Sequence, residues 1–202
     1  MPLRNRVTPD GRIIAAAARG AMMGNRGVLH DEHRRIVRTH KNTAWLICLL
    51  EFRGRRRAVM SPGTYTELFF LDEAVALAAG HRPCGECRRD SYRAFLHAAG
   101  AERAGDLDRA LSRSRQGLRV SAPLQTLPDG VFVTLHQDRH DELRLLWRGA
   151  LHRWTPAGYV DPVTASGPAE VITPALTVTA LRRGYPVQVH PSTGVTGEAV
   201  TT

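Results

Sequence analysis

The chain contains few cysteines, a single lysine and no long apolar run. Its 202 residues include three cysteines, too few for the disulfide frameworks of small secreted domains. No run of 18 apolar residues occurs, which argues against a membrane-spanning helix. The start, residues 1–6, is not followed by the apolar segment of a secretory signal. We therefore expect a cytoplasmic protein.

Common catalytic motifs are also absent. The sequence contains no G-x-S-x-G, no P-loop, no Rossmann glycine pattern and no H-E-x-x-H. At 43% hydrophobic residues, the chain can bury one good core and need not contain two domains. We predict a single mixed α+β domain over residues 1–190 and a flexible tail over residues 191–202, where no core signal is left.

The positive charge of the chain is carried by arginine. The formal net charge is +9, and all but one of the 28 basic residues are arginine, the exception being Lys41. A GC-rich genome would explain the ratio of arginine to lysine but not the excess of basic over acidic residues. Arginine binds phosphate with two hydrogen bonds and stacks on bases. The charge therefore favours a nucleic-acid partner, DNA in the first place, with RNA as the alternative.

The strongest local motif is the C-x-x-C formed by Cys84 and Cys87, which follows the sequence G-H-R-P and leads into a predicted helix over residues 88–99. Two thiolates at this spacing can share one tetrahedral zinc, and a helix N-terminus helps to keep them deprotonated. A redox pair of the thioredoxin type would need a βαβ pattern, whereas a short alanine-rich helix over residues 72–79 precedes this motif. The sequence thus predicts a zinc knuckle at a helix N-terminus, within a region of about residues 40–100.

Further zinc ligands have to come from outside the knuckle. Cys48, in the middle of a predicted strand over residues 44–52, is the remaining cysteine and our third ligand. His40 lies eight residues before it and is the favoured fourth ligand, because it could approach from the start of the same strand. Other histidines stay open as alternatives: His30, His33 and His81.

The segment from Phe69 to Cys87 combines an aromatic strand end, a short alanine-rich helix and the sequence G-x-R-P-C-x-x-C. It resembles the second half of the Ada-type metal-binding domain of bacterial DNA alkylation repair, in which four cysteines hold zinc and one accepts a methyl group from DNA phosphate. The resemblance implies that Cys84 and Cys87 are the downstream zinc ligands and that the protein works on DNA. That family has two cysteines upstream of the helix, whereas this chain has Cys48 alone. The resemblance therefore favours a structural zinc over methyl transfer.

A second interpretation uses the same cysteines in catalysis. Zinc-dependent nucleobase deaminases combine H-x-E with a later P-C-x-x-C, and their glutamate moves the protons. The chain contains His30 and Glu32 in such an H-x-E, and Pro83 before the knuckle. The long gap between the two halves and the helix before Pro83 count against a deaminase.

Among reactions on DNA, base excision fits best, which makes a DNA glycosylase-like hydrolase acting on modified or damaged bases our preferred function. Such an enzyme needs a pocket for a flipped base and one carboxylate to position water, or an amine that attacks the sugar. No spacing singles out one residue, so five candidates remain: Asp31, Glu51, Glu67, Asp72 and the amine of Lys41. A non-catalytic nucleic-acid-binding or regulatory module is the alternative.

Phosphate contacts are expected at an arginine-rich hairpin turn over residues 53–57 and at the start of the knuckle helix. The candidate residues are Arg53, Arg55, Arg56, Arg57, Arg88 and Arg89.

The remaining elements follow from periodicity and turn residues. We expect a turn at residues 9–11 between two extended segments, and a loop over residues 20–27. Thr173 and Pro174 predict the start of a helix that Gly184 ends. The other expected elements are a strand returning over residues 57–60, a weak helix over 106–114, and strands over 131–136, 142–147 and 150–154.

Overall fold

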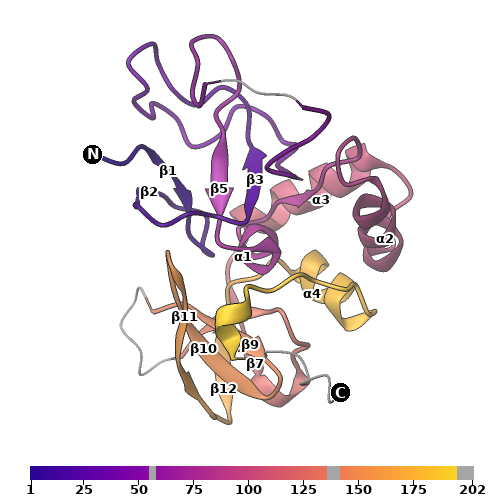
Figure 1. Cartoon of the computed structure of the whole chain (residues 1–202). Helices are drawn as coiled ribbons and strands as arrows, with labels where there is room; N and C mark the ends of the chain where they lie inside the picture. The colour runs from indigo at the N-terminus through magenta and orange to yellow at the C-terminus, as the bar shows by residue number, and fades with distance from the viewer. Residues whose placement is uncertain (55–57, 136–141, 195–202) are drawn as a thin grey trace, which may run out of the picture.

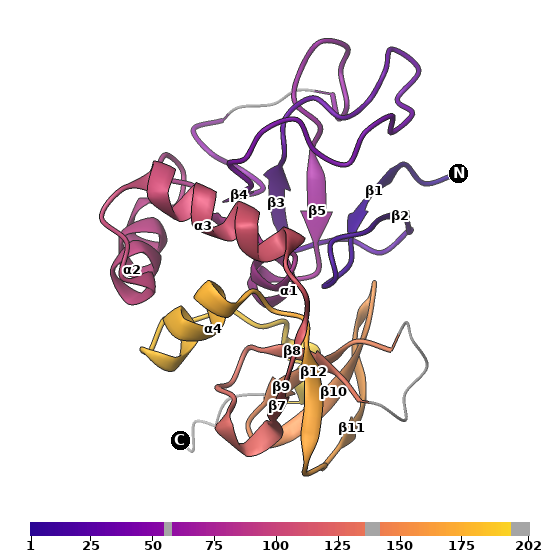
Figure 2. The ribbon, with the colours of Figure 1, turned by 180° about the vertical axis from the view of Figure 1, so that it is seen from behind.

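The computed structural model describes residues 1–54, 58–135 and 142–194, which form a mixed α+β fold with two six-stranded sheets. The two sheets lie on opposite sides of the short helix α1, and three longer helices are gathered along one flank (Figures 1 and 2). The helices of the described residues are α1 (Glu73–Ala78), α2 (Arg89–Ala99), α3 (Ala104–Gln116) and α4 (Ala175–Arg182).

The first sheet is built from the N-terminal half of the chain. Its strand order is β2-β1-β5-β3-β4-β6, and β3 pairs antiparallel with both β4 and β5. The sheet places β6, the strand just before the C-x-x-C motif, parallel and next to β4. The strands are β1 (Arg4–Val7), β2 (Ile13–Ala15), β3 (Met22–Asn25), β4 (Leu46–Cys48), β5 (Leu68–Phe70) and β6 (Arg82–Pro83).

The second sheet is antiparallel throughout, in the order β11-β10-β9-β8-β12-β7. The tight turn between β9 and β10 holds Arg148 and Gly149 at φ 49° and 78°, and positive φ at both central residues is what a two-residue type I′ hairpin needs. The strands are β7 (Val120–Pro123), β8 (Phe132–Thr134), β9 (Arg144–Trp147), β10 (Ala150–Thr155), β11 (Gly158–Val163) and β12 (Pro168–Val171).

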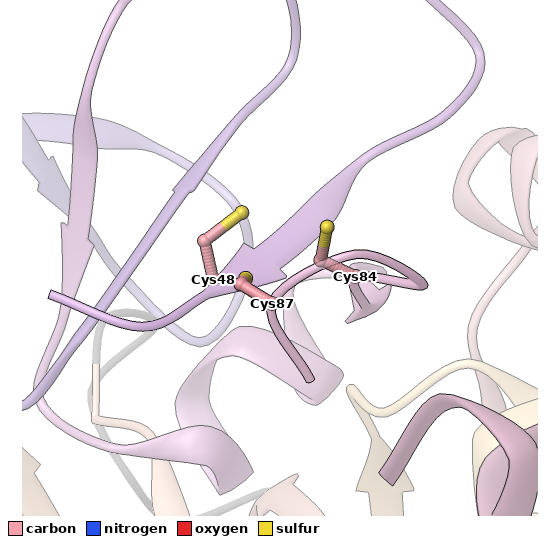
Figure 3. Close-up of side chains that lie close together, drawn as sticks. All are labelled: Cys48, Cys84 and Cys87. Atoms are coloured by element: carbon pink, nitrogen blue, oxygen red, sulfur yellow. The ribbon is translucent and has the colours of Figure 1, made fainter. Parts of the chain in front are cut away.

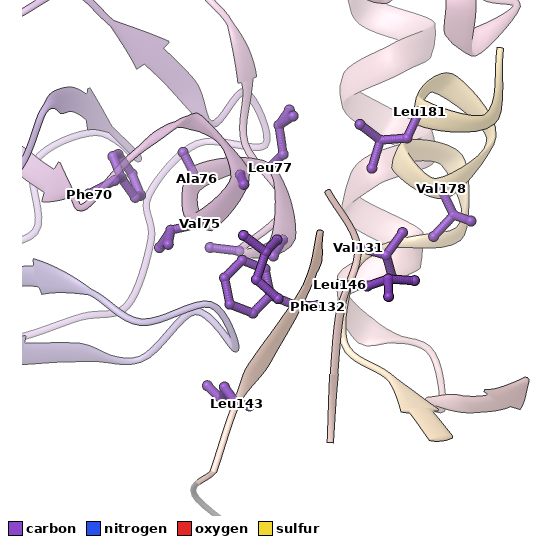
Figure 4. Close-up of a cluster of buried hydrophobic side chains, with 14 of the residues drawn as sticks. Phe70, Val75, Ala76, Leu77, Val131, Phe132, Leu143, Leu146, Val178 and Leu181 are labelled. Atoms are coloured by element: carbon purple, nitrogen blue, oxygen red, sulfur yellow. The ribbon is translucent and has the colours of Figure 1, made fainter. Parts of the chain in front are cut away.

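The hydrophobic core surrounds α1, all of whose residues are buried. Figure 4 shows Val75 and Leu77 of this helix close to Phe132 of the second sheet, with Leu181 of α4 beyond it. Helix α1, which is rich in alanine, contacts β5 of the first sheet and β8 of the second. This one helix therefore connects the core under the first sheet with the core under the second.

The N-terminal end of α1 carries two buried carboxylates. Asp72 caps the helix, since its side chain accepts a hydrogen bond from the Val75 amide, and its other oxygen accepts one from the Tyr159 hydroxyl (2.8 Å). Glu73 forms an ion pair with Arg88 (2.7 Å). These contacts tie α1 to α2 and to the C-terminal part of the chain.

The structure confirms the mixed α+β class and several elements that depend on local signals. The turn at residues 9–11, the alanine-rich helix, and the knuckle helix ending at Gly100 are present where they were expected. The expected helix over residues 106–114 is longer. Strands β8 and β9 lie inside their predicted ranges, and β10 extends one residue beyond the predicted range of 150–154.

The predicted loop over residues 20–27 is wrong, because it contains β3, a strand in the interior of the first sheet. Gly24 explains the error. A Cβ at this position would lie 2.0 Å from the Leu46 carbonyl oxygen, so the close approach of β3 and β4 requires glycine, which sequence patterns associate with loops.

Three further expectations need correction. The returning strand over residues 57–60 falls partly outside the described residues, and Ala58–Met60 form no strand. Thr173 does not cap α4, because its hydroxyl accepts a hydrogen bond from the Phe132 amide instead. The start of the predicted tail is ordered against the sheet: the Ser192 hydroxyl accepts a hydrogen bond from the Tyr159 amide (2.8 Å).

None of the helices in the described residues has the length and apolar character needed to cross a membrane.

Candidate metal centre

The three cysteines of the chain come together at one end of the first sheet. One ligand atom from each of Cys48, Cys84 and Cys87 lies within 4.8 Å of the other two (Figure 3). Cys48 is the last residue of β4, whereas Cys84 and Cys87 occupy the turn between β6 and α2. The parallel pairing of the two strands fixes this approach, because the Cys84 amide donates a hydrogen bond to the Ile47 carbonyl (2.9 Å).

The environment of the thiols sets their charge. The pKa of Cys84 is lowered to about 5, mainly by a hydrogen bond from the Cys48 thiol, with help from the amides of Cys87 and Glu86 and against the effect of burial. The pKa of Cys48 is raised by that same hydrogen bond and by burial. Burial also raises the pKa of Cys87. Without a cation the cluster thus carries one thiolate at neutral pH, and a metal ion would deprotonate the other two.

The donor set fits a soft or borderline metal ion. Three sulfur atoms within 4.8 Å of one another can bind one ion together, and thiolates are preferred by zinc, copper(I) and iron–sulfur clusters over magnesium or calcium. By its chemistry, the cluster could hold such a metal ion.

The thiols also line a cavity of about 660 Å³, a volume typical of small-molecule sites. Most of its wall is apolar and comes from β3, β4, β5 and the loops that follow β4. The residues around the thiols are Met23, Asn25, Leu46, Leu49, Leu50, Phe52, Val59, Tyr65, Glu67, Phe69 and Glu86.

Glu67 is the buried acidic residue of this cavity, with a fractional exposure of 4%. Its Oε2 atom accepts a hydrogen bond from the Met60 amide (2.8 Å). Met60 is itself fully buried and has φ 56°, an unfavourable conformation for a residue with a side chain. The loop is thus held in a strained conformation that fixes the Glu67 carboxylate in the cavity wall.

The prediction of His40 as the fourth ligand is wrong. His40 is exposed and its ring packs against Trp45, with 5.6 Å between the ring centroids. Side chains alternate along a strand, so Trp45 points to the face opposite Cys48. His81 packs against the same Trp45 ring and is likewise not part of the thiol cluster.

The H-x-E part of the deaminase pattern, His30 and Glu32, does not lie with the three thiols either. His30 hydrogen-bonds to the Thr66 hydroxyl (2.6 Å) and to the Ser61 carbonyl (3.1 Å). Glu32 is exposed beside His33. Neither residue of the H-x-E belongs to the metal-ligand group, so the pattern matches by sequence alone.

The five candidate catalytic residues are dispersed. Asp31 pairs with Arg35 (2.7 Å) on the surface, and the side chains of Glu51 and Lys41 are exposed. Asp72 is buried at the start of α1. Among the five, Glu67 is the one that lines the thiol cavity.

The arginines predicted to bind phosphate lie in different environments. Arg88 is buried in its ion pair with Glu73 and holds the fold together, so its assignment to nucleic acid is wrong. Arg89 is exposed. Arg53 is also exposed, and its guanidinium lies 5.0 Å from the centre of the ring of Phe52, a residue that lines the cavity. Arg55, Arg56 and Arg57 lie outside the described residues.

Comparisons with protein-family models, curated proteins and solved structures found no match to this chain.

Proposed function

We propose that the protein binds one zinc ion through Cys48, Cys84 and Cys87 and processes nucleic acid, DNA in the first place, by acting on a modified base in the adjoining cavity. The observation that carries this proposal is that all three thiols line a cavity of about 660 Å³. The ligands of a metal site enclosed in a hydrophobic core would not line a cavity large enough for a substrate.

The ligand count supports a reactive site over a purely structural one. Structural zinc sites are closed by four protein ligands, whereas catalytic sites keep three and leave one position open. Among the described residues, the group contains three ligands. Zinc at such a site supplies Lewis-acid chemistry.

The cavity wall supports a base as the substrate. Phe52, Tyr65 and Phe69 provide aromatic surface against which a planar base can stack. Glu67 supplies the one carboxylate that base excision requires, to accept a proton from water or to stabilise the developing sugar cation. The exposed Arg53, whose guanidinium lies over the Phe52 ring, and the net charge of +9 favour the approach of a phosphate backbone.

Glu67→Gln should reduce activity on DNA with modified bases by about a hundredfold or more, because the amide cannot take up a proton. The metal content should not change, since Glu67 is not one of the grouped ligands. Release of free bases and formation of abasic sites, followed by mass spectrometry, measure the activity.

Glu51→Gln is the matched control, because Glu51 is an exposed carboxylate outside the cavity lining. It should retain full activity. Equal loss in both variants, or full activity of Glu67→Gln, would contradict the role of Glu67.

A non-catalytic nucleic-acid-binding module is the second candidate, because the net charge of +9 accounts for binding without any reaction. It would be the better description if the protein binds DNA or RNA and alters no substrate of either kind.

Binding to DNA should weaken steeply as salt rises. Replacing Arg55, Arg56 and Arg57 together by glutamine should lower the slope of log affinity against log salt by about one unit for each lost phosphate contact. Fluorescence anisotropy with two unrelated duplexes at several salt concentrations measures this, and an unchanged slope would move the contact surface elsewhere.

A further inference from the structure

A second cavity, of about 260 Å³, lies on the opposite side of the paired strands β3 and β4 from the thiol cavity. Asn25 of β3 pairs with Leu46 of β4, and both side chains line the thiol cavity. The next residues outward, Arg26 and Trp45, line the second cavity instead. This cavity is closed by the C-terminal end of α3, the end of β12 and the beginning of α4, where these elements meet near α1 (Figure 2).

Arg26 is buried in the wall of this cavity with a fractional exposure of 1%. Its Nε donates a hydrogen bond to Nε2 of His81 (3.2 Å), and its Nη1 donates one to the Gly11 carbonyl (2.9 Å). Its Nη2 is buried without a hydrogen-bond partner. Neither acceptor carries a charge. The Gly11 carbonyl is neutral, and burial, together with the charges of Arg26 and Arg115, holds the pKa of His81 well below its usual value.

A second guanidinium, that of Arg115, lies against the same tryptophan ring and lines the same cavity. The guanidinium carbons of Arg26 and Arg115 lie 3.8 Å and 4.0 Å from the centre of the Trp45 ring. Arg115 donates hydrogen bonds to two backbone carbonyls, those of Gly80 (2.8 Å) and Thr43 (2.9 Å). Across the described ranges, no carboxylate forms an ion pair with either arginine.

Two positive charges thus share one partly enclosed space without an ion-pair partner of their own, since the carboxylate that acts on Arg115, Asp108, is already paired with Arg82. Burying a cation without a partner is unfavourable, and burial together with Arg115 lowers the pKa of Arg26 to about 9. An anion in the cavity would offset that penalty.

The remaining polar groups of the cavity agree with an anionic ligand. Helix α4 begins there at Ala175 without a side-chain cap, so its first amides are available to an anion. Asp10 is the one acidic residue among the described lining, and Arg12 neutralises it at 2.8 Å. Arg119 adds a further positive side chain and pairs with Glu170 at the surface.

We propose that this cavity is a phosphate-binding site in which Arg26 and Arg115 hold one phosphate group against Trp45 and the start of α4. Two arginines and a helix N-terminus match the double negative charge of a terminal phosphate better than the single charge of a carboxylate. The phosphate comes either from a small phosphate ester or from the end of a nucleic-acid strand. The site does not depend on metal binding at the thiols.

Titration of the protein with inorganic phosphate at constant ionic strength tests the site. Calorimetry should show saturable binding, and the unfolding temperature should rise with phosphate concentration, because a ligand that binds the native state stabilises it. Sodium chloride at the same ionic strength should produce neither effect.

Arg26→Met and Arg115→Gln should each weaken phosphate binding by about tenfold or more, since each removes charge-assisted hydrogen bonds. Arg109→Gln is the control: Arg109 is exposed, pairs with Asp106 and lies outside the cavity lining, so it removes the same charge elsewhere. If Arg26→Met fails to fold, Arg115→Gln decides. Absence of saturable binding, or equal binding by the two cavity variants and the parent, would overturn the proposal.

A second set of titrations identifies the source of the phosphate. A short oligonucleotide with a 5′-phosphate is compared with the same oligonucleotide without it and with a nucleoside monophosphate. Tighter, Arg26-dependent binding of the phosphorylated strand assigns the site to a strand end. Equal, Arg26-dependent affinity for the nucleoside monophosphate assigns it to a small ester.

Discussion

Replacing Cys84 with serine should remove the bound metal and lower the free energy of unfolding by several kcal/mol. A serine hydroxyl is a poor ligand for zinc, and the free energy of binding a metal to a site that exists only in the folded chain is also free energy of folding. Cys84 is the thiol with the lowered pKa and accepts the hydrogen bond of Cys48, so its replacement also weakens this side-chain contact between β4 and the knuckle. Metal analysis together with urea unfolding measures both effects.

Addition of a chelator to the parent protein is the internal control. It should bring the unfolding curve of the parent close to that of Cys84→Ser, and should leave the curve of the variant where it was. A parent protein whose unfolding is indifferent to chelator would show that the cluster contributes no metal-dependent stability.

Glu73→Ala should cost about 3–5 kcal/mol of stability, the usual loss when one partner of a buried ion pair is removed. Arg88 would then be left as a buried cation. The Tyr185 hydroxyl, which donates to Glu73 at 2.6 Å, and the Gln188 amide, at 3.1 Å, would lose their acceptor as well. Because these contacts join α1 to α2 and to the C-terminal segment, the whole fold should unfold at lower urea concentration.

Glu102→Ala is the matched control for this experiment, because Glu102 is exposed just before α3. Its replacement should change stability by less than about 0.5 kcal/mol. A loss of under about 1 kcal/mol in Glu73→Ala would mean that the buried pair and its hydrogen bonds are replaced by water or by rearrangement.

Those parts of the fold that depend on neighbouring residues could be predicted from the sequence. The C-x-x-C turn, the alanine-rich helix before it and the helix that ends at Gly100 follow from local spacing, capping and glycine. The approach of Cys48 to the knuckle was expected only because it is the remaining cysteine. What produces it is the parallel pairing of β4 with β6, which no local pattern encodes.

Features that depend on which face of the sheet a side chain occupies could not be predicted from the sequence. His40 was chosen for its distance along the chain, yet it packs with Trp45 on the face opposite the thiols. Glu67 was one of several equivalent carboxylates until the fold placed it in the cavity wall. Arg26 directly follows β3, a strand that sequence patterns do not predict because it contains Gly24. No sequence signal therefore distinguishes this buried arginine from the exposed ones.

Zinc content of protein purified without added metal tests the central claim most directly, measured in parallel on the parent chain and on Cys48→Ser. We expect about one zinc ion per parent chain and a marked loss in the variant, because the structure places the Cys48 thiol with those of Cys84 and Cys87. A parent chain with near-zero zinc, or a Cys48→Ser variant that keeps its full zinc content, would contradict a metal centre built from these three thiols.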